Sequence, residues 1–267
     1  MSIVHFFLLP GLLLGGAVVA AESSDHPAPG SQASFVSCPI YRDTDAGRKS
    51  GCWIATDGAT GQRYDVSDSP AKPWVGRQIL VEGVVSGGPD ICGGVALNPV
   101  RVAILPETCP EAIIPAEGYP SKPSVMPKDV MMPIGFARPV PEGPFSKQTY
   151  QIYFDLGEDR LTYQSVETTL DRAMLYAVAS DARLRVTGYA DGRGIVVSGR
   201  RLKESKRLAK ARADMVKRAL VGLGVPSKAI KLSWNLDPAP VPSQTGMLSP
   251  SKRRVTIELE PAAIAGK

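Results

Sequence analysis

The pattern of apolar and polar positions changes character near the middle of the chain. In the second half, apolar and polar residues alternate in four short segments: 150–154, 184–188, 230–234 and 255–259. Each segment predicts a half-buried strand. Apolar residues recur at helical spacing over 166–177 and 208–223, which predicts two amphipathic helices. The order β-α-β-α-β-β predicts a domain at 147–261 in which the helices pack on one face of a mixed sheet.

The first half shows no helical period of useful length. Its apolar positions and turn residues instead indicate five short strands: 52–55, 63–66, 78–85, 93–97 and 100–105. The segment 34–109 is therefore predicted to be a small all-β domain, with an OB-like barrel as the suggested architecture. Such a barrel does not specify a ligand. The whole chain is expected to be an α+β protein with two domains.

The remaining segments have the composition of connecting chain. Residues 110–146 contain nine prolines, which remove backbone donors and fix φ, so we expect a semi-rigid linker. Residues 22–33 are rich in Ser, Pro and Gly, which predicts disorder. Residues 262–267 are expected to be a short tail.

The N-terminus is typical of an export signal. Residues 3–20 are almost wholly apolar, and small residues follow at Ala20 and Ala21 before a polar stretch. Residues 1–21 are therefore predicted to be a cleaved signal peptide. The alternative is an uncleaved membrane anchor, because the run is about long enough to span a bilayer. Pro10 and the neighbouring glycines favour cleavage.

The four cysteines support export. All of them lie in the first half, and an even number in an exported segment suggests two disulfides. Three pairings are possible, and we expect Cys38–Cys52 and Cys92–Cys109 because local closure is simplest. Zinc is the competing explanation, but the spacings are wide and no CxxC occurs. We therefore expect no metal and no cofactor.

One arginine breaks the apolar stripe of the second predicted helix. Arg212 lies four residues from both Leu208 and Val216, so its guanidinium needs an acceptor or the edge of the face. Asp191 follows the second predicted strand of the C-terminal domain, which places a carboxylate near the helix. Taken alone, these two residues could form a plain ion pair.

A wider set of residues resembles the OmpA C-terminal-like family of peptidoglycan-binding domains. The matching residues are Gly188 and Asp191 after the strand, Leu208, Arg212 and Ala213 on the helix, Arg253, Arg254 and Val255 at the last strand, and Phe154 and Asp155 at the first. The resemblance covers about residues 150–260. It does not extend to the β-rich half.

The resemblance implies a binding mode. Members of the family bind the diaminopimelate of the peptidoglycan stem peptide, whose end carries an ammonium beside a carboxylate. Asp191 would bind the ammonium, and Arg212 would bind the carboxylate through a planar two-pronged contact. Arg254 and Arg253 would hold the site together or face the glycan. The implied function is non-covalent peptidoglycan binding that anchors the β-rich domain, or its partner, to the cell wall.

The expected partners and location follow from this reading. We expect peptidoglycan as partner, a further envelope protein at the β-rich domain, and no nucleic acid; a membrane is a partner only if the N-terminal segment is uncleaved. The expected location is the periplasm, with outer-membrane or cell-wall association as a further option. No histidine base accompanies the serines in the folded part of the chain, so we expect no enzyme activity.

The sequence also departs from the family's pattern. Tyr189 and Ala190 replace a His and a Thr, Lys252 replaces an Asn, and an insertion separates Asp191 from the helix. These departures leave an alternative open: an envelope-assembly or secretion-system scaffold whose degenerate domain binds protein. Ten Lys or Arg lie between Arg193 and Arg218. They indicate either a patch for an anionic polymer or a solvated helix face with a mobile basic loop.

Overall fold

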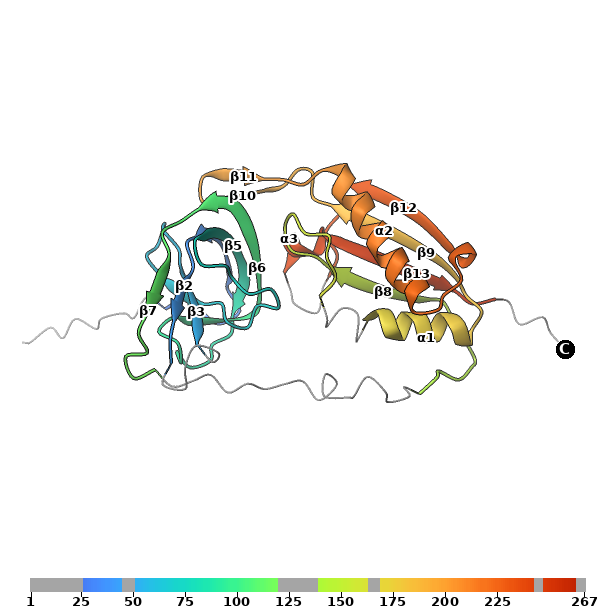
Figure 1. Cartoon of the computed structure of the whole chain (residues 1–267), viewed down its shortest axis with the longest axis horizontal. Coiled ribbons are helices and arrows are strands. Elements are labelled where there is room, and N and C mark those ends of the chain that lie inside the picture. The colour runs from blue at the N-terminus through green and yellow to red at the C-terminus, as the bar shows by residue number, and fades with distance from the viewer. Residues whose placement is uncertain (1–25, 45–50, 120–138, 163–168, 243–246, 263–267) are drawn as a thin grey trace, which may run out of the picture.

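The computed structural model describes residues 26–44, 51–119, 139–162, 169–242 and 247–262. The predicted signal peptide and much of the predicted linker lie outside these ranges. Within them, no helix combines the length and apolar character needed to cross a membrane. The described chain forms two units, a β-rich unit (residues 32–114) and a C-terminal unit (residues 148–260) (Figure 1).

The β-rich unit is a single seven-stranded sheet. Its strands are β1 (Gln32–Ser37), β2 (Ile40–Arg42), β3 (Cys52–Thr56), β4 (Arg63–Asp65), β5 (Arg77–Val85), β6 (Val95–Thr108) and β7 (Ala112–Ile114). Their order is β1-β5-β6-β4-β3-β2-β7, with β4 parallel to β6 and β2 parallel to β7. Only Cys38 and Pro39 separate β1 from β2, so one stretch of chain pairs with β5 at one side and with β3 at the other.

The strand prediction for this unit was partly right. Three predicted strands coincide largely with β3, β4 and β5, and the predicted segments 93–97 and 100–105 both overlap one strand, β6, which begins at Val95. The strands β1, β2 and β7 were not predicted. They are stabilised by pairing with distant strands rather than by strong local patterns. The strand β2 and most of β1 lie inside the predicted all-β domain, whereas β7 lies in the predicted linker.

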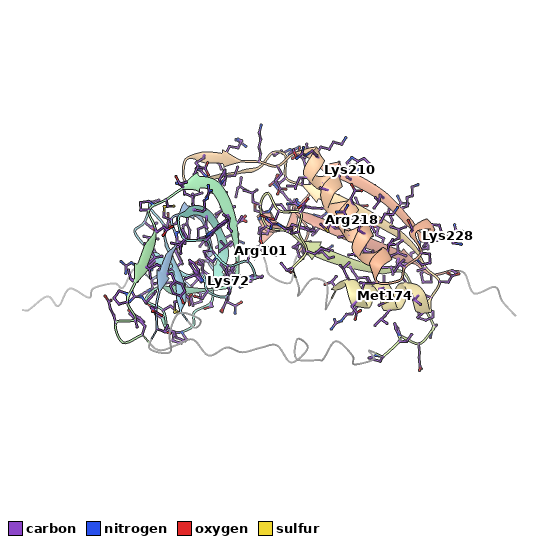
Figure 2. The ribbon with its side chains drawn as sticks, in the orientation of Figure 1. Lys72, Arg101, Met174, Lys210, Arg218 and Lys228 are labelled. Carbon is purple, nitrogen blue, oxygen red and sulfur yellow. A yellow bond between two sulfur atoms is a disulfide. The ribbon has the colours of Figure 1, made fainter. Side chains whose placement is uncertain are left out.

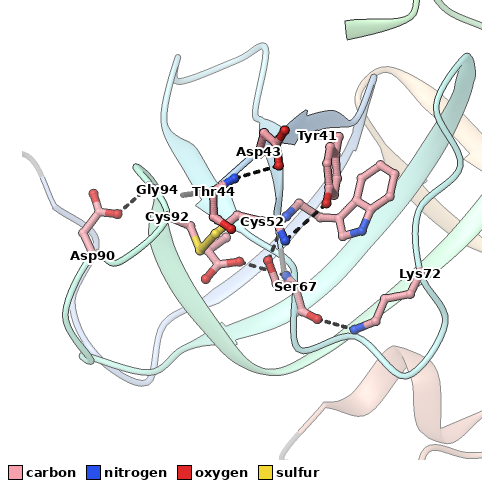
Figure 3. The surroundings of a disulfide bond; sticks show 12 residues. Tyr41, Asp43, Thr44, Cys52, Ser67, Lys72, Asp90, Cys92 and Gly94 are labelled. Carbon is pink, nitrogen blue, oxygen red and sulfur yellow. Dashed lines mark hydrogen bonds between the residues drawn. A yellow bond between two sulfur atoms is a disulfide. The ribbon is translucent and has the colours of Figure 1, made fainter. Parts of the chain in front are cut away.

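The disulfide pairing predicted from local closure was wrong. The structure joins Cys38 to Cys109 and Cys52 to Cys92; Figure 3 shows the second bond and its surroundings. Sheet order, rather than sequence distance, brings these residues together. With loops of 71 and 40 residues, each bond is worth about 4 kcal/mol in the chain-entropy model. All four cysteines are oxidised, so the zinc alternative is excluded.

The C-terminal unit has the predicted order of main elements. It comprises β8 (Gln148–Tyr153), α1 (Asp171–Ala179), β9 (Arg183–Ala190), β10 (Ile195–Val197), β11 (Arg200–Leu202), α2 (Lys206–Gly222), the 3-10 turn η4 (Ser227–Ala229), β12 (Ile230–Leu236), α3 (Leu248–Ser251) and β13 (Arg254–Glu260). The sheet order is β12-β9-β13-β8, with β9 parallel to β12 and the other pairs antiparallel. The mixed sheet is as predicted. Helix α2 packs along β9 and β12 (Figure 1).

The hairpin β10–β11 was not predicted and lies in the insertion that follows Asp191. It reaches from the C-terminal unit to the β-rich unit (Figure 1). Val197 of the hairpin is buried in a small apolar cluster with Leu80 and Leu105 of the β-rich unit and Leu156 after β8. The insertion therefore brings the two units into apolar contact.

Gly188 sets the distance between β9 and α2. A Cβ at this position would lie 2.0 Å from the carbonyl oxygen of Ala209. We expect Gly188→Ala to lower the free energy of unfolding by about 3 kcal/mol in urea titrations, because the helix must move away from the sheet. Gly222→Ala is the control: nothing lies within 4 Å of its Cβ, so we expect a gain of about 0.5 kcal/mol. Equal stability of the two variants would contradict this packing argument.

Candidate functional site

Arg212 lies on α2 with its side chain fully buried. A guanidinium has five N–H donors, and each one has an acceptor here. Nη1 and Nη2 donate to the two carboxylate oxygens of Glu204 at 2.8 and 2.6 Å. The other three donors reach backbone carbonyl oxygens: Glu158 at 2.8 Å, Tyr189 at 2.9 Å and Asp155 at 3.1 Å. Arg212 therefore has no donor left for a ligand in this structure.

Glu204 comes from the end of the insertion, two residues before α2 begins. Its side chain is 1% exposed, and its oxygens also accept the backbone N–H groups of Gly157 at 2.9 Å and Asp191 at 3.0 Å. The buried pair thus has four hydrogen bonds to the carboxylate and five from the guanidinium. Saturation of this kind compensates the desolvation of two charges.

Asp191 holds a different partner. Its side chain is 1% exposed, with Oδ1 accepting the N–H of Gly194 at 3.0 Å and Oδ2 3.4 Å from Nζ of Lys252. The lysine side chain is 24% exposed. The plain ion pair between Asp191 and Arg212 is therefore not what these contacts show, because each residue has its own counter-charge.

The two pairs together have a recognisable charge pattern. The Asp191 carboxylate faces an ammonium, and the Arg212 guanidinium faces a carboxylate. Glu204 links the two positions, since one of its oxygens accepts both the Asp191 N–H and Arg212 Nη1. An ammonium and a carboxylate side by side are the groups of a zwitterion, and here the chain itself provides both.

The other two predicted site residues lie in the chain's interior. Arg253 is fully buried and pairs with Glu82 on β5 of the β-rich unit, while its Nε donates to the carbonyl of Phe154 at 3.4 Å. Burial alone would lower the pKa of Arg253, but the charge and hydrogen bond of Glu82 outweigh burial and raise it above the ordinary value. Arg253 and Glu82 therefore form part of the contact between the two units, which we call the joint.

Arg254 is also nearly buried. Its Nη1 donates to the carbonyl oxygens of Ser251 at 2.6 Å and Ala239 at 3.3 Å, and its guanidinium stacks 4.5 Å from the ring centre of Tyr189. Burial lowers the pKa of Arg254. Tyr189, which replaces a histidine of the family pattern, thus supports Arg254 through a cation–π contact.

The joint between the units lies against the Arg212 site. Arg101 of the β-rich unit, labelled in Figure 2, donates to the Asp155 carboxylate at 2.8 Å and to the carbonyl of Tyr153 at 3.2 Å. The Asp155 carbonyl is one of the acceptors of Arg212. The segment 153–158 is therefore held from one side by the β-rich unit and from the other by Arg212.

Three residues of this site escaped the sequence analysis: Glu204, Lys252 and Glu82. One signal for Glu204 was available, because it is the only acid among the cations of the insertion. Lys252 was noted only as a departure from the family pattern. Within the described residues, no group of three His, Cys, Asp or Glu side chains is placed to hold a metal.

Comparisons with known proteins agree with the family resemblance of the C-terminal half. The model of the OmpA family matches residues 153–253. An outer membrane protein of Gluconacetobacter diazotrophicus is 31% identical over 117 residues, which is 43% of this chain and 31% of the relative. The match thus spans less than a third of the relative's length.

Several solved structures are similar to part of this chain. The OmpA-like domain of FopA1 from Francisella tularensis is 18% identical, with 44% of this chain and 77% of that chain covered and a TM-score of 0.35. The peptidoglycan-associated lipoprotein from Burkholderia pseudomallei is 21% identical, with 42% and 90% covered and a TM-score of 0.33. The motif residues and the family match together show that the C-terminal half of this chain is an OmpA-family domain.

Proposed function

We propose that this chain is a cell-envelope protein whose OmpA-family domain is a rigid platform for the β-rich unit. In this proposal, Glu204 occupies the position where members of the family bind the carboxylate of diaminopimelate. The observation that carries the proposal is the saturation of Arg212, whose five donors all have acceptors within the chain. The domain therefore acts through protein contacts rather than through the wall peptide.

The magnitudes favour a closed site. Separating a buried, hydrogen-bonded ion pair costs about 3–5 kcal/mol. A ligand held by one charged pair with a Kd of about 1 mM gains about 4 kcal/mol in total. The free energy gained by binding such a ligand would therefore be about equal to the cost of displacing Glu204 from Arg212. Arg212 is also fully buried, so the ligand would have to enter the interior before making its first contact.

Co-sedimentation with insoluble diaminopimelate-type peptidoglycan tests this proposal. We expect the mature wild-type protein to pellet no more with peptidoglycan than without it, because its carboxylate-binding donors are taken. Free diaminopimelate in excess is the control for specificity. Pelleting that free diaminopimelate abolishes would contradict the proposal and establish binding at the zwitterion site.

Peptidoglycan binding through Asp191 and Arg212 is the second candidate function. It is favoured by the charge pattern, since both receptor groups are retained and are adjacent. Lys252 is partly exposed and only 3.4 Å from Asp191, so this half of the site is the easier one to open. In this alternative the protein anchors its β-rich unit to the wall, with Arg253 and Arg254 supporting the site. The same sedimentation experiment decides between the candidates.

The β-rich unit would provide the partner-binding part of the platform. We propose an OB-like closed barrel, supported by the strand order and by the way β1 and β2 pair at opposite sides of the sheet. The envelope placement is supported by the family match and by two disulfides, which form in oxidising compartments. In this proposal the exported protein works in the periplasm without enzyme activity and binds an envelope protein.

A further inference from the structure

We infer that one basic surface of the OmpA-family domain binds the anionic headgroups of a lipid membrane. This basic face consists of six exposed cations on the hairpin β10–β11, its flanks and the start of α2: Arg193, Arg201, Lys203, Lys206, Arg207 and Lys210. They lie within 18 residues of sequence. The face is separate from the buried Arg212 pair, and the inference does not depend on whether that site is closed.

The charges of the basic face are largely uncompensated. Glu204, the acid nearest in sequence, is buried against Arg212 and contributes nothing to the surface. Asp214 pairs with Lys210 at 2.6 Å. Asp237 accepts the backbone N–H of Arg193 at 2.5 Å and so also lies beside the face. In the described part of the chain, Lys210 is the one member of the face with an ion pair.

The start of α2 is unusual for a helix of 17 residues. Lys206 and Arg207 occupy its first turn, which contains no acid, and Ser205 makes no side-chain cap. The N-terminal end of a helix carries a partial positive charge, so cations there are disfavoured. A local choice that opposes helix stability indicates a functional reason. An anion bound at this end would be favoured by both the basic side chains and the partial positive charge of the helix end.

The hairpin, which carries Arg201 between the flanking cations Arg193 and Lys203, is held against the β-rich unit. Its Val197 is buried between the two units, and Ser198 accepts the N–H of Val36 through its hydroxyl at 2.9 Å. Arg200 forms an ion pair with Glu107 of the β-rich unit at 3.2 Å. From the sequence, a mobile basic loop was one alternative for this segment. The structure instead shows a hairpin that packs against the β-rich unit. A docked hairpin loses less backbone entropy on binding a surface than a flexible loop does.

A lipid surface fits this face better than a soluble polyanion. Val196 is 65% exposed and lies opposite Arg201 in the hairpin. An exposed apolar side chain among cations suits the headgroup region, where it enters the apolar boundary while the cations meet phosphate. Each Lys or Arg near an anionic membrane strengthens binding about fivefold at low salt.

Vesicle co-flotation tests the inference. We expect the mature protein to bind vesicles of phosphatidylglycerol mixed with phosphatidylcholine, and to bind pure phosphatidylcholine vesicles far more weakly. Removing three cations together, with Lys203→Ala, Lys206→Ala and Arg207→Ala, should weaken binding about a hundredfold at low salt. Added salt should weaken the wild type in the same direction.

The matched control removes three exposed cations outside the basic face: Arg218→Ala, Lys228→Ala and Lys231→Ala. Figure 2 places Lys210 near the start of α2 and Lys228 toward the other end of the domain. This variant has the same net charge and should keep most of the binding. Equal losses in the two variants, equal binding to neutral vesicles, or binding to heparin without binding to vesicles would each overturn the inference.

Discussion

Replacing Glu204 with alanine is expected to lower the free energy of unfolding by about 3–5 kcal/mol. The change leaves Arg212 fully buried with two of its five donors unpaired and its charge uncompensated. It also removes the acceptor for the N–H groups of Gly157 and Asp191. For a chain of this size the melting temperature should fall by roughly 10 °C. Urea titration and calorimetry provide the measurement.

Asp214→Ala is the control for this change. Asp214 pairs with Lys210 on the exposed side of α2, so its loss should cost only about 0.5 kcal/mol. The double change Glu204→Leu with Arg212→Leu should recover much of the lost stability, because it removes both buried charges. A loss below about 1 kcal/mol for Glu204→Ala would mean that Arg212 reaches water or another acceptor, and the closed site would be refuted.

The second large effect is expected at the joint between the units. Glu82→Gln keeps the shape of the side chain but removes the charge that Arg253 faces in a fully buried position. We expect a loss of about 3 kcal/mol in urea titrations, because the uncompensated guanidinium remains in the interior. The joint should also loosen, which small-angle scattering would detect as a larger radius of gyration.

The exposed pair of Lys147 and Glu260 gives the reference for this experiment. Both side chains are mostly solvated, at 79% and 67% exposed, so Lys147→Ala should leave stability and scattering nearly unchanged. An unchanged radius for Glu82→Gln would show that the apolar cluster around Leu80 and Val197 holds the units together without the buried pair. The platform would then rest on apolar packing alone.

The fold of the C-terminal half could be predicted because local and global signals agree there. Strand alternation and helical spacing each persist over whole elements, and Gly188 permits the close approach of α2 that the motif requires. The β-rich half was harder. Its first strand is short and interrupted at Cys38 and Pro39, and it is held by partners far along the chain. The disulfide pairing failed for the same reason, since sheet order sets which cysteines meet.

The site residues show a different limit of sequence reasoning. The motif located Asp191 and Arg212 but carried no information on their partners. Glu204 pairs with Arg212 because the insertion folds back as a hairpin and ends beside α2. Arg253 is likewise paired by a strand 171 residues away. The family motif therefore located Asp191 and Arg212 in the fold. Their partners, Lys252 and Glu204, lie outside the motif and could not be read from it.

Titrating meso-diaminopimelate into the wild-type protein by calorimetry tests the central claim most directly. The closed site predicts no saturable heat from the wild type, because Glu204 holds the guanidinium and Lys252 faces Asp191. The Glu204→Ala variant frees the Arg212 donors and should show saturable binding under the same conditions. Saturable heat from the wild type, lost when Asp191 is changed to Asn, would contradict the account and restore peptidoglycan binding as the function of the domain.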